Sequence, residues 1–346
     1  MPSVLCCEIV RRNPFKLEAL PWIAKVYRYP FDRYGSIGTQ ALFGAPNYLL
    51  FLFFQKFWPL KLAGAFKYQI QGREQIVEFN ARNTQFHALY FKQFDMGYEP
   101  QITALINLLL PSDGVFYDIG SNWGWFSFQA ASRPDFRGQV HAFEPFKSTY
   151  NDLSSLIQQT NLGTVIHAHN VALSDSVGSG SMRLPDHFQS GRAVLEAEPA
   201  GSANATAMAT LDSLKLPPPT IIKADVEGHE LRVFKGGTRL FSEHKPMLVF
   251  EHSRHDNNPG ESLQSLIFLH DLGYEFFHVG WLRTEQGRKY LVGDDADPTP
   301  QSKETLALAP FRWEERFLKP QGMNIFVCHR DKVPALKILF KECELG

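Results

Sequence analysis

Short apolar runs alternate with segments of helical period through the middle of the chain. The run at 115–118 is apolar and aromatic, and apolar residues follow it from Phe126. Runs at 139–143 and 220–225 are likewise followed by stretches of helical spacing. Alternating strands and helices predict a mostly parallel sheet covered by helices. The expected strands are 115–118, 139–143, 165–172, 220–225, 247–251, 274–279 and 324–328, and the expected helices are 99–110, 124–132, 148–160, one ending near 242, and 261–272.

The flanking regions have a different character. Two apolar stretches on either side of Gly72 predict a hairpin over 66–79. We expect residues 1–65 to be an aromatic-rich helical extension and 66–346 to be the main domain. Within that domain, 174–210 is rich in glycine and serine and is expected to be a long irregular insertion, with a second insertion at 281–322.

The extension contains an apolar run at 48–54, which is far shorter than the ~20 residues that a membrane-spanning helix needs. Aromatic residues and Lys56 nearby would suit a weak peripheral membrane contact or a protein contact through 41–60. A helix packed against the main domain is the alternative, and it is the commoner role for such a run.

The first strand ends in a sharp turn that carries candidate chemistry. Asp118 ends the apolar run, and Gly120, Asn122 and Gly124 follow at alternate positions. Glycine permits a tight turn and a close approach to a ligand, and asparagine tolerates the left-handed conformation. This is the strand–turn–helix unit beyond which nucleotide-like ligands bind in doubly wound folds.

A second carboxylate stands at the end of the next expected strand. Glu144 lies 20 residues beyond Gly124, where an acidic residue contacts a ribose diol in such folds. Bulky Trp123 and the G-x-N-x-G spacing leave less room for a pyrophosphate than the dinucleotide fingerprint does. These features predict a site for an adenosine-type ligand without a pyrophosphate, and S-adenosylmethionine fits that description.

Composition excludes several classes. The 346 residues are 44% hydrophobic and 21% charged, with a formal net charge of −1. Such a balance is typical of a globular protein and argues against a nucleic-acid binder. The four cysteines form neither a zinc motif nor a disulfide framework, and no signal-peptide pattern begins the sequence. We therefore expect a cytoplasmic protein.

With these features together, the chain resembles the FkbM-type methyltransferases, a branch of the S-adenosylmethionine-dependent Rossmann-like enzymes. The resemblance covers roughly residues 95–280. The matching stretches, in order, are Asp118–Gly124, Ala142–Pro145, Ala172–Asp175, Thr210–Asp212 and Lys223–Glu230, with Pro246 and Glu251 after them. Each is weak alone, but five in this order are specific.

The resemblance implies a seven-stranded sheet with a reversed last hairpin, and methyl transfer to oxygen on a small molecule or glycan. This sequence departs from the family pattern at Ser121, where the family usually has Ala, and at His229, where a small residue is common. The residues it implies for the cofactor are Asp118, Gly120, Ser121, Asn122 and Gly124 at the methionine end, Glu144 at the ribose, and Asn170, Val171 and Ala172 near the adenine.

Candidate catalytic groups follow the fourth and fifth expected strands, whose ends converge on one cleft in a parallel sheet. Asp225 and Glu251 are the leading pair, and His229 or His252 could be the base that removes the acceptor's proton. Glu227 lies beside them in sequence. Each histidine is more often a solvated loop residue, Asp225 could cap the next helix, and Glu230 is more simply a first-turn helix residue. A divalent cation is a minority alternative, so we predict no metal.

Two other functional classes stay open. A nicotinamide-dependent oxidoreductase would have the G-x-G-x-x-G turn, which the sequence lacks. A non-catalytic interaction protein could keep the fold and use 41–60 as its working surface. No spacing in the sequence identifies the acceptor. Arg283 and Arg288 in the second insertion would suit a carboxylated or phosphorylated molecule, and plain solvent exposure would explain them equally well.

Overall fold

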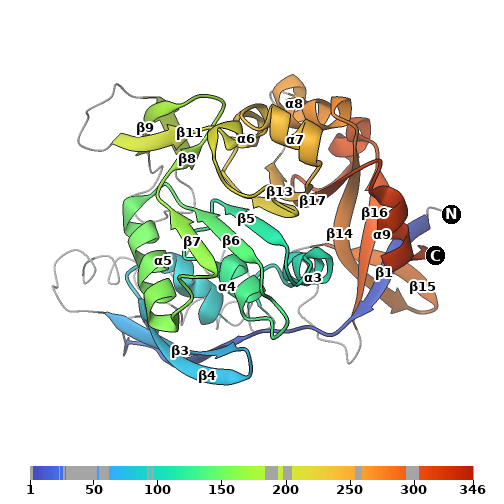
Figure 1. Cartoon of the computed structure of the whole chain (residues 1–346). Helices are drawn as coiled ribbons and strands as arrows, with labels where there is room; N and C mark the ends of the chain where they lie inside the picture. The colour runs from blue at the N-terminus through green and yellow to red at the C-terminus, as the bar shows by residue number, and fades with distance from the viewer. Residues whose placement is uncertain are drawn as a thin grey trace.

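A large twisted sheet runs through the protein, with helices on both of its faces (Figure 1). The computed structural model describes residues 3–22, 24–25, 28, 53, 62–91, 94, 97–183, 194–197, 205–253, 259–293 and 304–345. Within these ranges the main sheet has 11 strands, and two smaller sheets of four and three strands lie beside it.

Seven strands of the main sheet form its central part. In spatial order they are β7 (Ile166–His169), β6 (Gln139–Phe143), β5 (Val115–Ile119), β12 (Ile221–Ala224), β13 (Met247–Ser253), β17 (Gly322–His329) and β14 (Tyr274–Glu285). The first five are parallel, and β17 is antiparallel to both neighbours. Numbered along the chain, this order is 3-2-1-4-5-7-6. The predicted fold class, a Rossmann-like, mostly parallel seven-stranded sheet with a reversed last hairpin, is confirmed.

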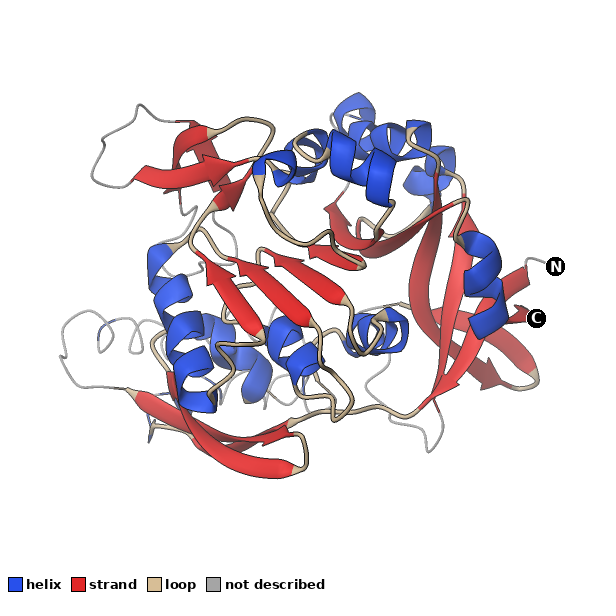
Figure 2. Cartoon of the chain, in the orientation of Figure 1, coloured by secondary structure: helices blue, strands red, loops and turns tan. Residues whose placement is uncertain are grey.

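Helices cover the sheet from both sides, as the alternating pattern predicts (Figure 2). One face carries α3 (Pro100–Leu109), α4 (Trp125–Ala131) and α5 (Lys147–Thr160), whose apolar residues join one core cluster. The other carries α6 (Glu230–Lys235), α7 (Thr238–His244) and α8 (Pro259–Asp271), around a second cluster. A short helix, α9 (Val333–Leu339), follows β17.

The helix predicted to continue to residue 242 is interrupted between α6 and α7. Gly236 lies against the strand region beside it, and a Cβ there would be 2.0 Å from the carbonyl oxygen of Ser174. This contact requires glycine, and Gly236 and Gly237 together weaken the helix at that point. The segment therefore forms two short helices.

The beginning of the chain is part of the main sheet, which differs from the helical extension expected there. Strand β1 (Ser3–Ile9) pairs with β16 (Glu304–Phe311) on one side and β18 (Lys341–Glu344) on the other. Val4, Leu5 and Cys6 on this strand are buried. Both ends of the chain thus lie at the same edge (Figure 1).

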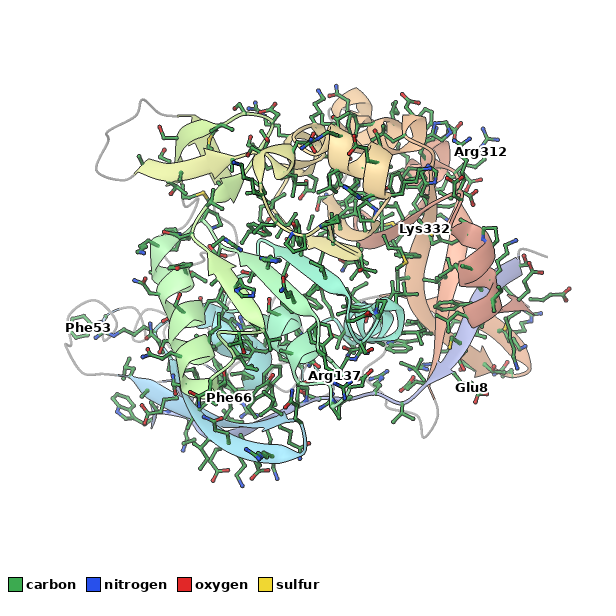
Figure 3. The ribbon with its side chains drawn as sticks, in the orientation of Figure 1. Glu8, Phe53, Phe66, Arg137, Arg312 and Lys332 are labelled. Atoms are coloured by element: carbon green, nitrogen blue, oxygen red, sulfur yellow. The ribbon has the colours of Figure 1, made fainter. Side chains whose placement is uncertain are left out.

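The predicted hairpin is present and forms a layer of its own. Strands β3 (Ala63–Ile70) and β4 (Arg73–Asn80) pair around a Gln71–Gly72 turn with positive φ at both residues, and β2 (Phe15–Ala19) pairs with β3. Phe66 and its neighbours fill the space between this sheet and α4 (Figure 3). A 3₁₀ turn, η1 (Thr84–Leu89), follows the hairpin.

Both predicted insertions contain regular structure. In the first, β9 (Gly178–Arg183), β10 (Val194–Ala197) and β11 (Ala205–Ala209) form a small sheet with β8 (Ala172–Leu173), and the 3₁₀ turn η4 (Leu211–Ser213) follows it. In the second, β15 (Arg288–Val292) pairs with β14, β16 joins the main sheet, and η5 (Trp313–Leu318) follows. The strands of the first insertion could not be predicted, because their many glycine, serine and alanine residues give little alternation of apolar and polar positions.

The aromatic segment 41–60 lies outside the described residues, apart from Phe53. Among the helices that the structure does describe, none is long and apolar enough to cross a membrane.

Candidate functional site

The turn between β5 and α4 has the backbone that its residues predict. Gly120, Asn122 and Gly124 have φ of 74°, 52° and 96°, all in the left-handed region. At Gly120 the close neighbour is protein, since a Cβ there would be 1.8 Å from the backbone oxygen of Asp225. The glycine thus allows β5 and β12 to approach each other at their carboxyl ends.

Glu144 holds this turn from the end of β6. Its Oε2 accepts a hydrogen bond from the backbone N–H of Asn122 at 2.9 Å, and its Oε1 accepts one from the N–H of Phe146 at 2.8 Å. The side chain is buried, and burial raises its pKa to about 7 despite these two bonds. Each oxygen has a further lone pair, so a hydroxyl donor can still bind beside the two backbone groups.

Asp118 is directed into the protein instead. Its Oδ2 accepts bonds from both the backbone N–H and the hydroxyl of Ser127, at 3.0 and 2.6 Å, and the residue is 1% exposed. Burial raises its pKa to about 6. The carboxylate of Asp118 thus ties α4 to β5 through Ser127.

The other residues implied for the cofactor lie around the same strand ends. Ser121 is buried, and its hydroxyl has no hydrogen-bond partner in the described part of the chain. Asn170 donates from Nδ2 to the carbonyl oxygens of Glu144 and Pro145, at 2.9 and 3.0 Å. Val171 and Ala172 follow it at the start of β8. The turn, Glu144 and the 170–172 segment thus adjoin one edge of the sheet.

Acidic groups gather around one buried lysine at the ends of β12 and β13. Lys223, 2% exposed, donates from Nζ to Oδ2 of Asp225 at 3.0 Å and lies 4.6 Å from the ring centre of Phe126. Burial alone would lower the pKa of Lys223, but Asp225 and the nearby Glu99 raise it overall. Burial, followed by repulsion from Asp225 and Glu99, raises the pKa of Glu251 to about 8.

One member of this group comes from the start of α3, and another follows β12. Glu99 is the residue before the helix and has a left-handed φ of 42°. The charge of Glu99, followed by the burial of Tyr98 itself, raises the pKa of neighbouring Tyr98 well above the usual value, and Asp225, Glu251 and Glu227 add to the effect. Glu227, exposed and itself at a φ of 52°, completes the cluster. We call Glu99, Asp225, Glu227 and Glu251 with Lys223 the acidic cluster.

His229 lies apart from the acidic cluster in its contacts. Its Nε2 is 2.9 Å from the hydroxyl of Ser174, between α6 and β8, and burial lowers its pKa. Glu230 behaves as the helix residue that its position predicts, since its Oε1 accepts bonds from the backbone N–H groups of Gly228 and Val226.

His252 is excluded as a base by its hydrogen bonds. Arg316 donates from Nε to its Nδ1 at 2.9 Å, so the other ring nitrogen carries the proton that is donated to the carbonyl oxygen of Ser262 at 2.7 Å. Both ring nitrogens are engaged and the side chain is 5% exposed. His252 therefore joins β13 to α8 and η5 as a structural residue.

Sequence reasoning missed Lys223, Glu99 and Arg316. Lys223 had a signal, because a single charge inside an apolar run marks a buried, paired group. Arg316 had none, since it sits 64 residues from the histidine it holds. The predicted role of Arg283 is also corrected: it donates to Glu304 at 2.7 Å, and both side chains are almost fully buried.

No group of three or more potential metal ligands is close enough to hold a metal ion among the described residues.

Comparisons with known proteins agree with this geometry. Residues 118–276 match the model of the methyltransferase FkbM domain. The chain is 29% identical over 162 residues to the hexuronic acid methyltransferase AglP of Haloferax volcanii, which covers 46% of this chain and 64% of that protein. The match thus spans less than two thirds of the relative's length.

Solved structures are also similar. The methyltransferase FkbM of Methylobacillus flagellatus is 19% identical with a TM-score of 0.37, over 66% of this chain and 52% of that one. The fibrillarin of Aeropyrum pernix, solved with natively bound S-adenosyl-L-methionine, is 14% identical with a TM-score of 0.32, over 70% and 81%. Residues 118–276 are thus similar to the methyltransferase FkbM domain, the family that the five ordered motifs predict.

Proposed function

We propose that the protein is an S-adenosylmethionine-dependent O-methyltransferase that acts on a hydroxyl of a sugar or glycan, with a hexuronic acid as the first acceptor to test. The acceptor class is suggested by the name of the Haloferax volcanii relative. The observation that supports the chemistry best is the acidic cluster, which lies beside the Gly120–Gly124 turn and contains a carboxyl group with a pKa of about 8.

The residues at the strand ends fit the cofactor. The hydroxyl of Ser121 is buried without a partner in the described residues, so a ligand group can satisfy it. We assign Gly120, Ser121, Asn122 and Gly124 to the methionine end, Glu144 to the ribose, and Asn170, Val171 and Ala172 to the adenine side. Asp118 acts through α4 and is a positioning residue, because its Oδ2 is bonded to Ser127.

When bound, the cofactor supplies a sulfonium methyl group that is already activated, so placement accounts for much of the rate. The protein's own task is to hold the acceptor hydroxyl in line with that methyl and to remove its proton. Glu251 suits the second task because a base with a pKa near the working pH combines an unprotonated form with useful basicity. The carboxylate of Glu251 would accept the hydroxyl proton, while the Gly120–Gly124 turn and Glu144 would hold the methyl donor in place.

Asp225 and Glu227 have a different role in this scheme. Asp225 is paired with Lys223, whose Nζ lies 3.0 Å from its Oδ2. Its remaining lone pairs can accept hydrogen bonds from the other hydroxyls of a sugar. Glu227 is exposed at the rim, where it can contact the acceptor. His229 is not assigned a catalytic role, because its contact is with Ser174.

The test begins with the cofactor. We expect S-adenosylhomocysteine to bind the full chain with a micromolar Kd in calorimetry, and NAD to give no heat under the same conditions. Labelled S-adenosylmethionine is then offered with glucuronate, glucuronate-containing oligosaccharides and glucose. Transfer to a uronic acid, lost in Glu251→Gln and kept in the exposed-site control Glu243→Gln, supports the proposal. Absence of S-adenosylhomocysteine binding would overturn it in favour of a non-catalytic protein.

A further inference from the structure

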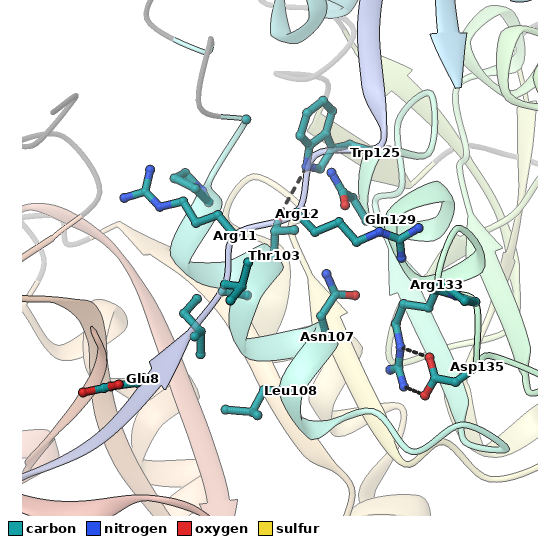
Figure 4. A pocket seen from close by; sticks show the side chains of 16 residues that line it. Glu8, Arg11, Arg12, Thr103, Asn107, Leu108, Trp125, Gln129, Arg133 and Asp135 are labelled. Atoms are coloured by element: carbon teal, nitrogen blue, oxygen red, sulfur yellow. Dashed lines mark hydrogen bonds and ion pairs between the residues drawn. The ribbon is translucent and has the colours of Figure 1, made fainter. Parts of the chain in front are cut away.

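A pocket of about 390 Å³ lies between α3, α4 and the segment that joins β1 to β2, and its lining includes no member of the acidic cluster (Figure 4). Its volume is at the lower end of the roughly 300–1,000 Å³ of small-molecule sites. Trp125 and Thr103 line it from the two helices and are joined by a 3.2 Å hydrogen bond. Both helices carry buried residues of the first core cluster, so two walls of the pocket belong to the core.

Polar atoms without partners line this pocket. Gln129, on α4, is 3% exposed, and neither its Nε2 nor its Oε1 has a hydrogen-bond partner in the described chain. The Oδ1 of Asn107, on α3, is likewise buried and without one. Buried amides in proteins are normally hydrogen-bonded, because leaving them unpaired is unfavourable for folding. Two such groups facing one pocket indicate that a ligand completes them.

A cation completes the pocket. Figure 4 shows Arg12 extending from the β1–β2 segment toward Gln129 and Arg133. Arg133 is bound through two hydrogen bonds to Asp135, at 2.7 and 3.2 Å. Arg12 instead donates to the backbone oxygen of Ser132, and it forms no salt bridge within the described ranges. Burial is the main cause that lowers the pKa of Arg12; the charge of Arg133 adds to it, while Tyr68 and Asp135 act in the opposite direction.

These atoms specify the chemistry of the ligand. The oxygens of Asn107 and Gln129 need hydrogen-bond donors, which hydroxyl groups supply. The guanidinium of Arg12 and the Nε2 of Gln129 need acceptors, and an arginine fork favours a carboxylate or phosphate. A neutral sugar would leave the charge of Arg12 unmatched, and a simple anion would leave the two amide oxygens unmatched.

We propose that this pocket binds a small hydroxylated anion, a sugar carboxylate or a sugar phosphate, at a site separate from the methyl-transfer centre. The site is independent of the proposed activity, since none of Arg12, Asn107 and Gln129 belongs to the acidic cluster or to the turn at Gly120–Gly124. It would therefore serve as a second point of attachment or as an effector site.

The test is calorimetry on the full chain without any methyl donor, using glucuronate and glucose 6-phosphate as probes. Glucose, acetate and inorganic phosphate are the controls for the missing charge and the missing hydroxyls. We expect at least one probe to bind with a Kd below about 1 mM and at least tenfold more tightly than every control. Preference between the two probes distinguishes a carboxylate ligand from a phosphate ligand.

Gln129→Met locates the binding. Methionine has a similar length and no amide, so the variant should melt no lower than the parent and should bind S-adenosylhomocysteine as the parent does, while losing at least tenfold in affinity for the sugar anion. Arg12→Met should lose a similar factor, and Lys16→Met, which removes an exposed cation from β2, should lose none.

Three results would overturn the proposal. The first is no binding of either sugar anion, which would leave a solvent-filled pocket. The second is inorganic phosphate binding as tightly as glucose 6-phosphate, which would indicate an adventitious ion only. The third is binding that Gln129→Met does not change, which would place it elsewhere. Since no methyl transfer is measured, failure of the proposed activity leaves these results interpretable.

Discussion

Gly120 meets the backbone of Asp225 so closely that an added methyl group would lie 1.8 Å from the Asp225 carbonyl oxygen. Gly120 also has a φ of 74°, which L residues rarely adopt. The two residues end β5 and β12, the strands that carry the proposed cofactor turn and the acidic cluster. Their contact therefore sets the distance between the two halves of the site.

Gly120→Ala should be strongly destabilising, because neither the backbone oxygen nor the left-handed turn can adjust cheaply. We expect a loss of about 2–4 kcal/mol in the free energy of unfolding, or no folded protein. The control is Gly163→Ala, at an exposed turn where a Cβ meets nothing within 4 Å. Thermal melts compare the stabilities of the two variants, and equal melting temperatures would contradict the close contact between Gly120 and Asp225.

Glu144→Gln should weaken the binding of S-adenosylhomocysteine. The amide that replaces one oxygen would point a donor at the N–H of Asn122 or Phe146, which disturbs the turn and removes the charge offered to the ribose. The expected loss is about 1–3 kcal/mol, the range for a hydrogen bond to a charged group. Calorimetry on this variant and on Glu243→Gln measures it, and an unchanged Kd would remove Glu144 from the cofactor site.

The rate of methyl transfer should rise with pH through about 8 and level off above it. The pKa of Glu251 is raised to about 8, so its carboxylate form, the one that can accept a proton, is half populated at that pH and becomes dominant above it. Glu251→Gln should lower the rate by roughly 10²–10⁴ and flatten this dependence. A pH profile with saturating cofactor and acceptor measures both effects. A parent profile that is flat between pH 6 and 9 would exclude Glu251 as the base.

Arg316→Met should destabilise the fold without acting on the cofactor directly. The buried guanidinium donates to the ring and the carbonyl of His252 and to the carbonyls of Pro320 and Gln321. Removing it leaves those acceptors unpaired, so we expect a loss of about 3 kcal/mol. The matched control, Arg312→Met, removes an exposed arginine whose pair with Glu314 contributes little. Chemical unfolding of both variants tests this, and equal stabilities would show that Arg316 is dispensable.

The sequence predicts the centre of the fold well because its strands are buried on both faces. All four residues of β12 are buried, and a long apolar run is the expected sign of such a strand. The turn at Gly120–Gly124 can also be predicted from the sequence, because a positive φ restricts the residue types that can occupy these positions.

The features that the sequence does not predict depend on contacts between residues far apart in the chain. Strand β1 is stabilised by β16, near the other end of the chain, and no local pattern reveals that pairing. The sequence makes His252 a candidate base, and only the hydrogen bond from Arg316 to its ring excludes that role. Glu99 joins the acidic cluster only because the start of α3 packs beside the ends of β12 and β13. In each case the tertiary contact, which local pattern does not encode, decides the role.

Three histidines stacked on β6 and β7 make stability depend on pH. The ring centre of His141 lies 5.1 Å from that of His167 and 5.3 Å from that of His169, and its Nδ1 is 3.1 Å from the Nε2 of His169. Burial, followed by the charges of His169 and His167, lowers the pKa of His141 to about 4. His141 therefore takes up a proton near pH 6.5 in the unfolded chain but only near pH 4 in the folded one. Its contribution to the free energy of unfolding is lost as the pH falls from about 6.5 to 4.

Replacing His141 should reduce this acid sensitivity. Buried acids such as Glu144, with a pKa raised to about 7, favour the folded state as the pH falls and oppose the histidine, so the informative quantity is the difference between parent and variant. Between about pH 7.5 and 5, the parent should lose about 2 kcal/mol more unfolding free energy than His141→Gln. Urea unfolding at both pH values measures the four free energies. Parallel losses in the two proteins would mean that His141 takes up its proton in the folded state as easily as in the unfolded one.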